Sequence, residues 1–194
     1  TKGYIETAKK MLPEVWKSNL PLKLKLLCTL HLTSNFVFPF ILLSGILNVP
    51  LVYIKQSGTH DDYFAFMSIF VLAFIGSFLF YLYSQKDIHE KDWKKRIYLF
   101  PIFLSGSMGL AFNNAKAVIE GLLNKRTEFV RTPKFSLVDK NDSWKNKKYA
   151  KTKVSYAVIF EFLLALYCLF GIGMSLYYLE ISAVPFQLMF FVGF

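Results

Sequence analysis

The chain has 194 residues, a formal net charge of +10 at pH 7, and a composition that is 54% hydrophobic and 18% aromatic. This composition excludes an ordinary soluble domain and favours an all-α membrane protein. The two cysteines, Cys28 and Cys168, stand in apolar segments without metal-ligand spacing, so we expect neither a disulfide framework nor a zinc site. The sequence begins without Met and stops within an apolar run, which predicts a piece of a longer protein.

Residues 1–25 predict an amphipathic interfacial helix. Between Tyr4 and Trp16, apolar side chains recur at steps of three and four residues, while lysines take the opposite face. Pro13 is expected to end or kink this helix near Leu12. Two placements remain open: in the headgroup plane with the lysines facing anionic lipid, or packed as a soluble helix on another domain.

Residues 26–96 predict two transmembrane helices and a basic cytoplasmic loop. The first span, residues 26–54, is long enough to cross the bilayer even with a kink at Pro39. The second span, residues 64–83, contains no charged side chain. The lysines that follow it place the loop on the same side as the lysine-rich N-terminal helix, as the positive-inside rule requires.

Polar residues gather in the first third of the 26–54 span. Hydroxyl and amide groups that face lipid are disfavoured and normally turn inward, so these residues are candidates for lining a water-filled or sugar-filled channel. His31 also has the simpler alternative of solvation near the membrane interface. The candidates are Thr29, His31, Thr33, Ser34 and Asn35.

Residues 97–123 decide the predicted topology. Their first part is apolar but contains Pro101, Gly106 and Gly109, and the remainder is amphipathic. If this segment crossed the bilayer, the basic loop after it would lie outside, against the positive-inside rule. We therefore expect an interfacial or re-entrant helix pair that stays on the cytoplasmic side. Its apolar stripe is predicted to be Ala111, Ala115, Val118 and Leu122.

Residues 124–153 form a basic loop in which polar chemistry is concentrated. From Lys125 to Lys153, ten Lys and Arg stand against three acids, a local balance of +7. Two interpretations remain open: a solvated loop that obeys the positive-inside rule, and a loop that binds phosphate groups.

Residues 154–194 predict a transmembrane hairpin whose second helix is truncated. The span at residues 154–179 contains Glu161, and an acid at that depth is costly unless it is paired or faces water. Glu161 is therefore a channel-lining candidate, with a simple ion pair to Lys151 or Lys153 as the alternative. In total we expect about four transmembrane helices, the last one truncated, plus amphipathic interfacial helices.

Residues 129–134, with the sequence Phe-Val-Arg-Thr-Pro-Lys, are similar to the gating-loop pattern F-x-V-T-x-K of processive family 2 glycosyltransferases. Phe129, Thr132 and Lys134 match that pattern in type and spacing. Arg131 stands where that pattern has Val. The resulting form F-V-R-T-P-K looks closer to the cellulose-synthase-like mannan and glucan synthases. The order of segments also resembles the C-terminal membrane region of the cellulose synthase and cellulose-synthase-like superfamily. Residues 1–3 look like the residues that directly follow the Q-x-x-R-W motif of that family.

This resemblance implies a hexosyltransferase that polymerises a β-linked polysaccharide and translocates it through a membrane channel. Its partners would be a UDP- or GDP-sugar donor, the growing polysaccharide or a lipid acceptor, and membrane lipids, with no nucleic acid. A divalent metal, Mg or Mn, is expected in a catalytic domain upstream, and none is expected to bind this fragment, which also carries no catalytic residue. The protein would be a multi-pass inner or plasma membrane protein with cytoplasmic basic loops.

The resemblance also implies roles for the gating residues. Arg131 and Lys134 would approach the pyrophosphate of the donor, because a guanidinium and an ammonium both neutralise phosphate charge. Thr132 would add a hydroxyl hydrogen bond, and Phe129 would anchor the closed loop. The N-terminal helix would support the acceptor site.

Three alternatives to this function remain open. Arg131 and Lys134 are also suited to binding lipid headgroups. For the whole protein, the alternatives are a non-processive glycosyltransferase acting on a lipid acceptor and a non-enzymatic membrane transport or scaffold component.

Overall fold

The computed structural model describes residues 1–58, 60–67, 69, 71–125 and 155–194. Within these residues every regular element is a helix, which confirms the all-α prediction. The α-helices are α1 (Lys2–Lys17), α2 (Leu22–Thr33), α3 (Val37–Gln56), α4 (Asp61–Met67), α5 (Val71–Ile88), α6 (Phe100–Gly109), α7 (Ala111–Leu122), α8 (Tyr156–Tyr177) and α9 (Val184–Gly193). The 3₁₀ turns are η1 (Ser34–Phe36), η3 (Trp93–Leu99) and η4 (Ile181–Ala183).

Two of the described helices are long and apolar enough to cross a membrane. The first is the continuous rod Leu22–Gln56, formed by α2, η1 and α3, and the second is α8. In the most apolar 18-residue stretch of each helix, only 17% and 11% of the stretch is buried inside the protein, respectively. The core helix of a soluble domain is mostly buried. This exposed apolar surface favours a lipid environment.

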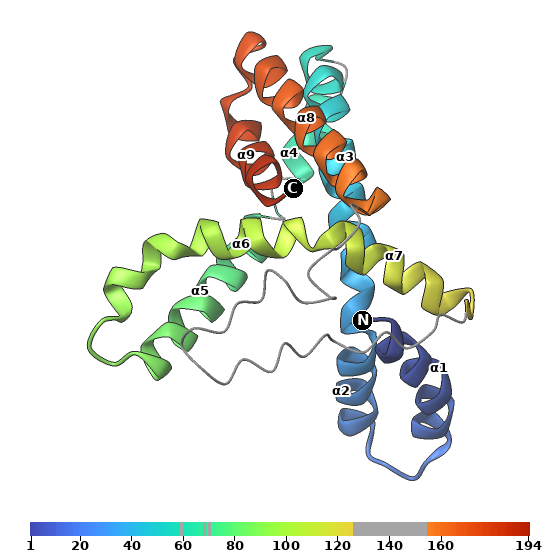
Figure 1. Cartoon of the computed structure of the whole chain (residues 1–194). Helices are drawn as coiled ribbons and strands as arrows, with labels where there is room; N and C mark the ends of the chain where they lie inside the picture. The colour runs from blue at the N-terminus through green and yellow to red at the C-terminus, as the bar shows by residue number, and fades with distance from the viewer. Residues whose placement is uncertain (59, 68, 70, 126–154) are drawn as a thin grey trace, which may run out of the picture.

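Helices α3 and α8 lie side by side and run parallel (Figure 1). The Tyr167 hydroxyl of α8 donates to the Ile46 carbonyl of α3 at 2.7 Å. Near the ends of the two helices, the ammonium of Lys55 in α3 pairs at 2.5 Å with the carboxylate of Glu180, which follows α8. We call the side on which α3 and α8 begin the N-terminal side, and the side on which they end the C-terminal side.

Helices α6 and α7 lie across the rod formed by α2 and α3, and α7 packs against η1, α3 and α1 (Figure 1). Its buried positions are Ala111, Ala115, Val118 and Gly121. The predicted stripe is therefore right at three positions and wrong at Leu122, which is 43% exposed. Gly121 takes the fourth position because Ile5 of α1 sits directly on it: a Cβ at Gly121 would lie 2.9 Å from the Ile5 Cβ.

Two glycines permit backbone contact between α6 and α9. A Cβ at Gly109 would lie 2.1 Å from the Gly193 carbonyl oxygen, and a Cβ at Gly193 would lie 2.4 Å from the Ser105 carbonyl oxygen. Small residues at helix crossings allow the close approach on which packing between apolar helices depends. The C-terminal helix is thereby held against the transverse helix pair.

Proline positions differ in part from the prediction. Of the two expected effects of Pro13, an end or a kink near Leu12, the end is wrong, because α1 continues through Pro13 to Lys17. Pro13 is exposed, where the loss of one helical hydrogen bond costs least. Pro39 lies in the first turn of α3, where its missing N–H is not needed, and the local irregularity is the 3₁₀ turn η1 just before it.

The predicted number of four membrane helices is not confirmed. The predicted span at residues 64–83 is divided between α4 and α5, and neither is among the two candidate membrane-crossing helices found in the described residues. Helix α5 leaves the group formed by α3, α8 and α9 and joins α6 through η3 (Figure 1). Helix α9 is apolar but has 10 residues.

A matched pair of glycine substitutions tests the crossing of α6 and α9. Gly109→Ala should lower the free energy of unfolding by about 1–3 kcal/mol, because the added methyl group collides with the Gly193 backbone. Gly106→Ala should raise it by about 0.5–1 kcal/mol, because a Cβ there meets no atom within 4 Å and alanine favours the helix. Unfolding of the full chain in detergent measures both. Equal effects of the two substitutions would refute the crossing.

Candidate functional site

The predicted gating residues Phe129, Arg131, Thr132 and Lys134 lie outside the described residues. The structure does describe the residues that flank this part of the chain, Lys125 at one end and Ser155 at the other. Lys125 marks the point at which the chain leaves α7, and Ser155 marks the point at which it enters α8.

Helix α7 ends in a left-handed cap that fixes the direction of the chain. Asn124 has a φ of 53°, a conformation that Asn adopts more readily than most residues. The Lys125 amide donates to the Glu120 carbonyl at 3.0 Å, and the Asn124 amide donates to the Gly121 carbonyl at 3.3 Å. These two bonds form the Schellman motif, which satisfies carbonyls at the end of a helix.

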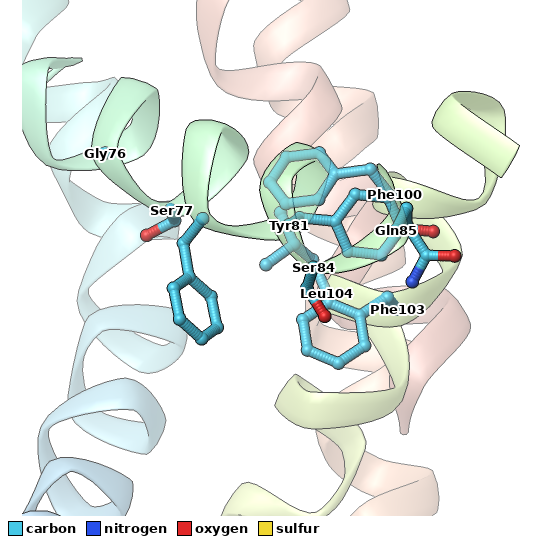
Figure 2. A pocket seen from close by; sticks show the side chains of 9 residues that line it. Gly76, Ser77, Tyr81, Ser84, Gln85, Phe100, Phe103 and Leu104 are labelled. Carbon is cyan, nitrogen blue, oxygen red and sulfur yellow. The ribbon is translucent and has the colours of Figure 1, made fainter. Parts of the chain in front are cut away.

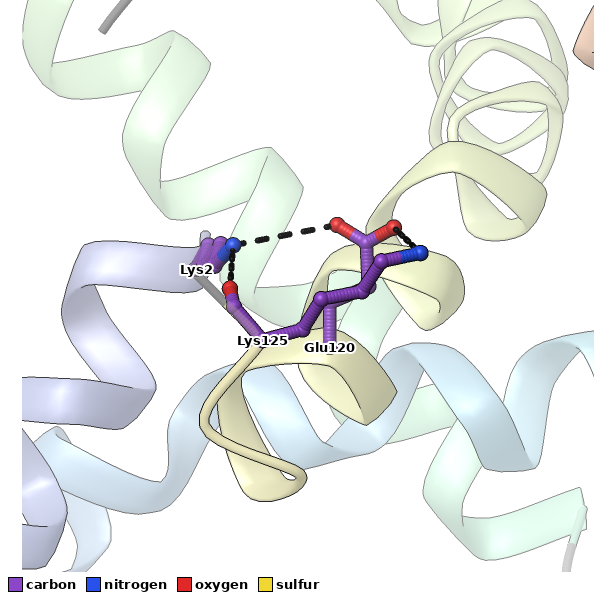
Figure 3. Close-up of polar contacts among 3 residues, drawn as sticks. All are labelled: Lys2, Glu120 and Lys125. Atoms are coloured by element: carbon purple, nitrogen blue, oxygen red, sulfur yellow. Dashed lines mark hydrogen bonds and ion pairs between the residues drawn. The ribbon is translucent and has the colours of Figure 1, made fainter. Parts of the chain in front are cut away.

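Charged side chains hold this cap against the start of α1 (Figure 3). The Glu120 carboxylate lies between the Lys2 ammonium at 4.0 Å and the Lys125 ammonium at 3.8 Å. Lys2 also donates to the Lys125 carbonyl. Lys9 donates to the Leu122 carbonyl at 3.0 Å and to Asn124 Oδ1 at 2.6 Å, which places a cation at the negative end of the α7 dipole. We call Lys2, Lys9, Glu120, Asn124 and Lys125 the α1–α7 anchor.

The other flank lies at the start of α8. The Ser155 hydroxyl caps α8 by accepting the Ala157 amide at 3.3 Å. The Asn113 side-chain amide of α7 donates to the Glu161 carboxylate at 2.7 Å, and the Phe112 and Phe160 rings stack at 5.7 Å. Both Lys125 and Ser155 are therefore on the N-terminal side of the two long helices. The alternative partners of Glu161, Lys151 and Lys153, lie outside the described residues.

Four of the five polar channel candidates of α2 and η1 bond to α1 or to their own helical segment. Thr29 donates to the Lys25 carbonyl at 2.8 Å and accepts from the Trp16 indole at 3.0 Å. His31 Nε2 lies 2.7 Å from the Tyr4 hydroxyl. Such bonds satisfy polar groups within an apolar helix.

Two of the remaining candidates follow the same pattern. The Thr33 hydroxyl donates to the Thr29 carbonyl at 2.8 Å, and the Ser34 hydroxyl donates to the His31 carbonyl at 2.9 Å. Asn35 lies in η1 and is half-buried. The structure thus gathers Thr29 and His31 beside α1, and places Glu161 with Asn113 of α7.

Sequence reasoning missed a buried polar pair between α8 and α9. The Ser175 hydroxyl donates to Gln187 Oε1 at 2.9 Å, and the two residues are 0% and 1% exposed. Among the described residues, the Gln187 amide nitrogen has no hydrogen-bond partner. The signal in the sequence was a glutamine within the apolar run 184–193, since polar residues in such segments are rare and costly.

In the part of the chain that the structure describes, the fold and these contacts define an all-helical protein with two candidate membrane-crossing helices. Compared with models of protein families, with curated proteins and with solved structures, the chain matches none of them. The similarity of residues 129–134 to a gating loop therefore stays a prediction. The described ranges also contain no group of three or more His, Cys, Asp or Glu side chains placed to hold a metal ion.

Removing the Glu120 carboxylate should loosen the α1–α7 anchor. Its two ion pairs are partly solvated, so Glu120→Ala should cost about 1 kcal/mol locally and speed amide exchange in residues 116–125 about fivefold. Glu6→Ala, which removes an exposed carboxylate from α1, is the control. The two variants are compared by hydrogen exchange of the full chain in detergent. Equal exchange rates in this range would contradict a role of Glu120 in holding the end of α7.

Proposed function

We propose that this chain is the membrane-embedded channel and gating region of a family 2 glycosyltransferase. The intact enzyme would be a hexosyltransferase of the inner or plasma membrane that polymerises a β-linked polysaccharide from a UDP- or GDP-sugar and translocates it. Residues 129–134 would form its gate, and residues of α1 would support the acceptor site.

The observation that carries this proposal is the position of the flanks of residues 126–154. A gate that binds the pyrophosphate of a nucleotide sugar must leave and re-enter the membrane region on the side where the donor is available. Lys125 is bound to Lys2 through the α1–α7 anchor, and Ser155 begins α8 on the same side. This arrangement is the one that the gating prediction requires.

The distribution of charge supports a cytoplasmic N-terminal side. Residues 1–25 carry six lysines and two acids, whereas Lys55 at the end of α3 is paired with Glu180 and is followed by Asp61 and Asp62. Cytoplasmic segments near membrane helices carry an excess of Lys and Arg. The proposed orientation therefore places α1 and both flanks in the cytoplasm.

The proposed gate works by positioning and electrostatics. Lys134 would neutralise the leaving pyrophosphate as a point charge and Arg131 would bind it in a bidentate manner, with Thr132 adding a hydroxyl hydrogen bond. Phe129 would anchor the gate in an apolar or sugar-stacking position and help to exclude water during transfer. A divalent metal, Mg or Mn, held by an upstream catalytic domain would share the neutralisation of phosphate charge.

The polymer path is proposed to use the hydrogen-bonding groups at the N-terminal side. Glu161 and Asn113 form an amide–carboxylate pair at the junction of α7 and α8. A carboxylate can accept from more than one donor, so Glu161 has capacity left for a sugar hydroxyl. Thr29, His31, Thr33, Ser34 and Asn35 are proposed to contribute at the level of α2 and η1.

The kinetics of a lysine variant test the gate. In the full-length enzyme, Lys134→Ala should raise the KM for the nucleotide sugar or lower kcat by about tenfold or more, because one charge that stabilises the pyrophosphate is lost. Lys145→Ala removes a cation from the same basic segment but from outside the motif, and should leave both constants nearly unchanged. Equal effects of the two substitutions would mean that Lys134 acts only as one of many charges in the basic segment. The gating proposal would then be wrong.

Cysteine labelling tests the orientation. In a variant without Cys28 and Cys168, Lys10→Cys and Lys145→Cys should react with a membrane-impermeant maleimide from the cytoplasmic side, and Gln56→Cys from the opposite side. Sealed vesicles of both orientations provide the measurement. Labelling of residues 10 and 145 from opposite sides would exclude the proposed topology.

A further inference from the structure

Helices α5 and α6 enclose a cleft of about 730 Å³ that the proposed transferase function does not use (Figure 2). Both helices contribute apolar side chains to it, and α5 adds a few polar ones. Its principal lining residues are Phe80, Tyr81, Phe100 and Phe103, with Ser84 and Gln85 as polar members.

The floor of the cleft is a cluster of aromatic rings. Phe100 is 4% exposed, and its ring centre lies 5.1 Å from that of Phe78 and 5.2 Å from that of Tyr81. Tyr81 also contacts Phe103 at 5.6 Å. Phe80, in contrast, is 78% exposed at the rim. The cleft therefore has a packed apolar floor and an open apolar edge.

One end of the cleft leads into a basic stretch. Ser84 and Gln85 are followed by residues 86–96, which contain five Lys and Arg and three acids, a balance of +2. The Tyr81 hydroxyl, at the wall of the cleft, donates to the Arg96 carbonyl at 3.0 Å. This bond fixes the end of the basic stretch beside the apolar lining. Lys91, Lys94 and Lys95 in this stretch are exposed.

We propose that this cleft binds an acyl chain of an anionic phospholipid, with the headgroup held by the basic stretch 86–96. The apolar lining suits a hydrocarbon chain, and the adjacent cations suit a phosphate group. A chain that moves from bilayer to cleft gains little hydrophobic free energy, because lipid tails are already apolar. Selection of the lipid therefore comes from the charge of its headgroup. The proposal requires membrane insertion but not transferase activity.

Photo-crosslinking of lipids to the full chain in nanodiscs tests this proposal. The probes are a phosphatidylglycerol and a phosphatidylcholine that carry the same photoreactive acyl chain, used separately at equal density. Peptides of α5 and α6 should be labelled about fivefold to tenfold more by the phosphatidylglycerol probe. The triple variant K91Q/K94Q/K95Q should bring the two probes to nearly equal labelling.

A matched pair of glycine variants tests occupancy of the cleft. Gly76 lines the cleft and Gly173 lies on α8, and a Cβ at either position meets no atom within 4 Å, so neither backbone excludes a side chain. Gly76→Phe should reduce labelling of α5 and α6 by both probes at least fivefold, and Gly173→Phe should leave it unchanged. Equal labelling by the two probes that is also unchanged in the Gly76→Phe variant would overturn the proposal. Crosslinks from these helices to a second copy of the chain would also overturn it and assign the cleft to self-association.

Discussion

The parallel packing of α3 and α8 determines how the rest of the chain is arranged. Because both helices begin on the same side, the residues between them must leave from the C-terminal side of α3 and return to the N-terminal side before α8 starts. Helices α4 to α7 make that return, and α7 ends against α1. The Tyr167–Ile46 hydrogen bond and the Lys55–Glu180 ion pair fix the alignment of the two long helices. Lys125 lies on the N-terminal side because α7 ends against α1, and Ser155 lies there because it caps the start of α8.

The remaining helices approach each other closely at glycine residues. Phe190 of α9 rests on Gly45 of α3, where a Cβ would lie 2.8 Å from the ring. Gly171 of α8 similarly makes room for Val49 and for the buried amide of Gln187. In a lipid environment the hydrophobic effect would provide no force between such helices, so shape and hydrogen bonds would decide their partners. The Ser175–Gln187 bond adds a polar contact to the same interface.

Periodicity in the sequence predicted helices and faces but not partners. The stripe Ala111, Ala115 and Val118 was predictable because side chains of an α-helix three and four positions apart share a face. The choice of Gly121 over Leu122 depends on Ile5, which is more than a hundred residues away in the chain. The Asn113–Glu161 and Lys2–Glu120 pairs were unpredictable for the same reason. The cost of a charge in an apolar segment nevertheless identified Glu161 as a residue that needs a partner.

The contacts that attach α7 to α1 and those that attach α6 to α9 depend on different forces. The α1–α7 anchor combines partly solvated ion pairs of Glu120 with hydrogen bonds from Lys2 and Lys9. Mobile ions weaken the attraction between such charges over about 10 Å at 0.1 M salt. The contact of Gly109 with Gly193 is steric, and ions do not weaken it. The attachment of α7 to α1 therefore has a component that depends on ionic strength, and the attachment of α6 to α9 through Gly109 does not. A rise in salt concentration would weaken the ion pairs of Glu120, while the packing of Ile5 on Gly121 and the contact of α6 with α9 stay in place.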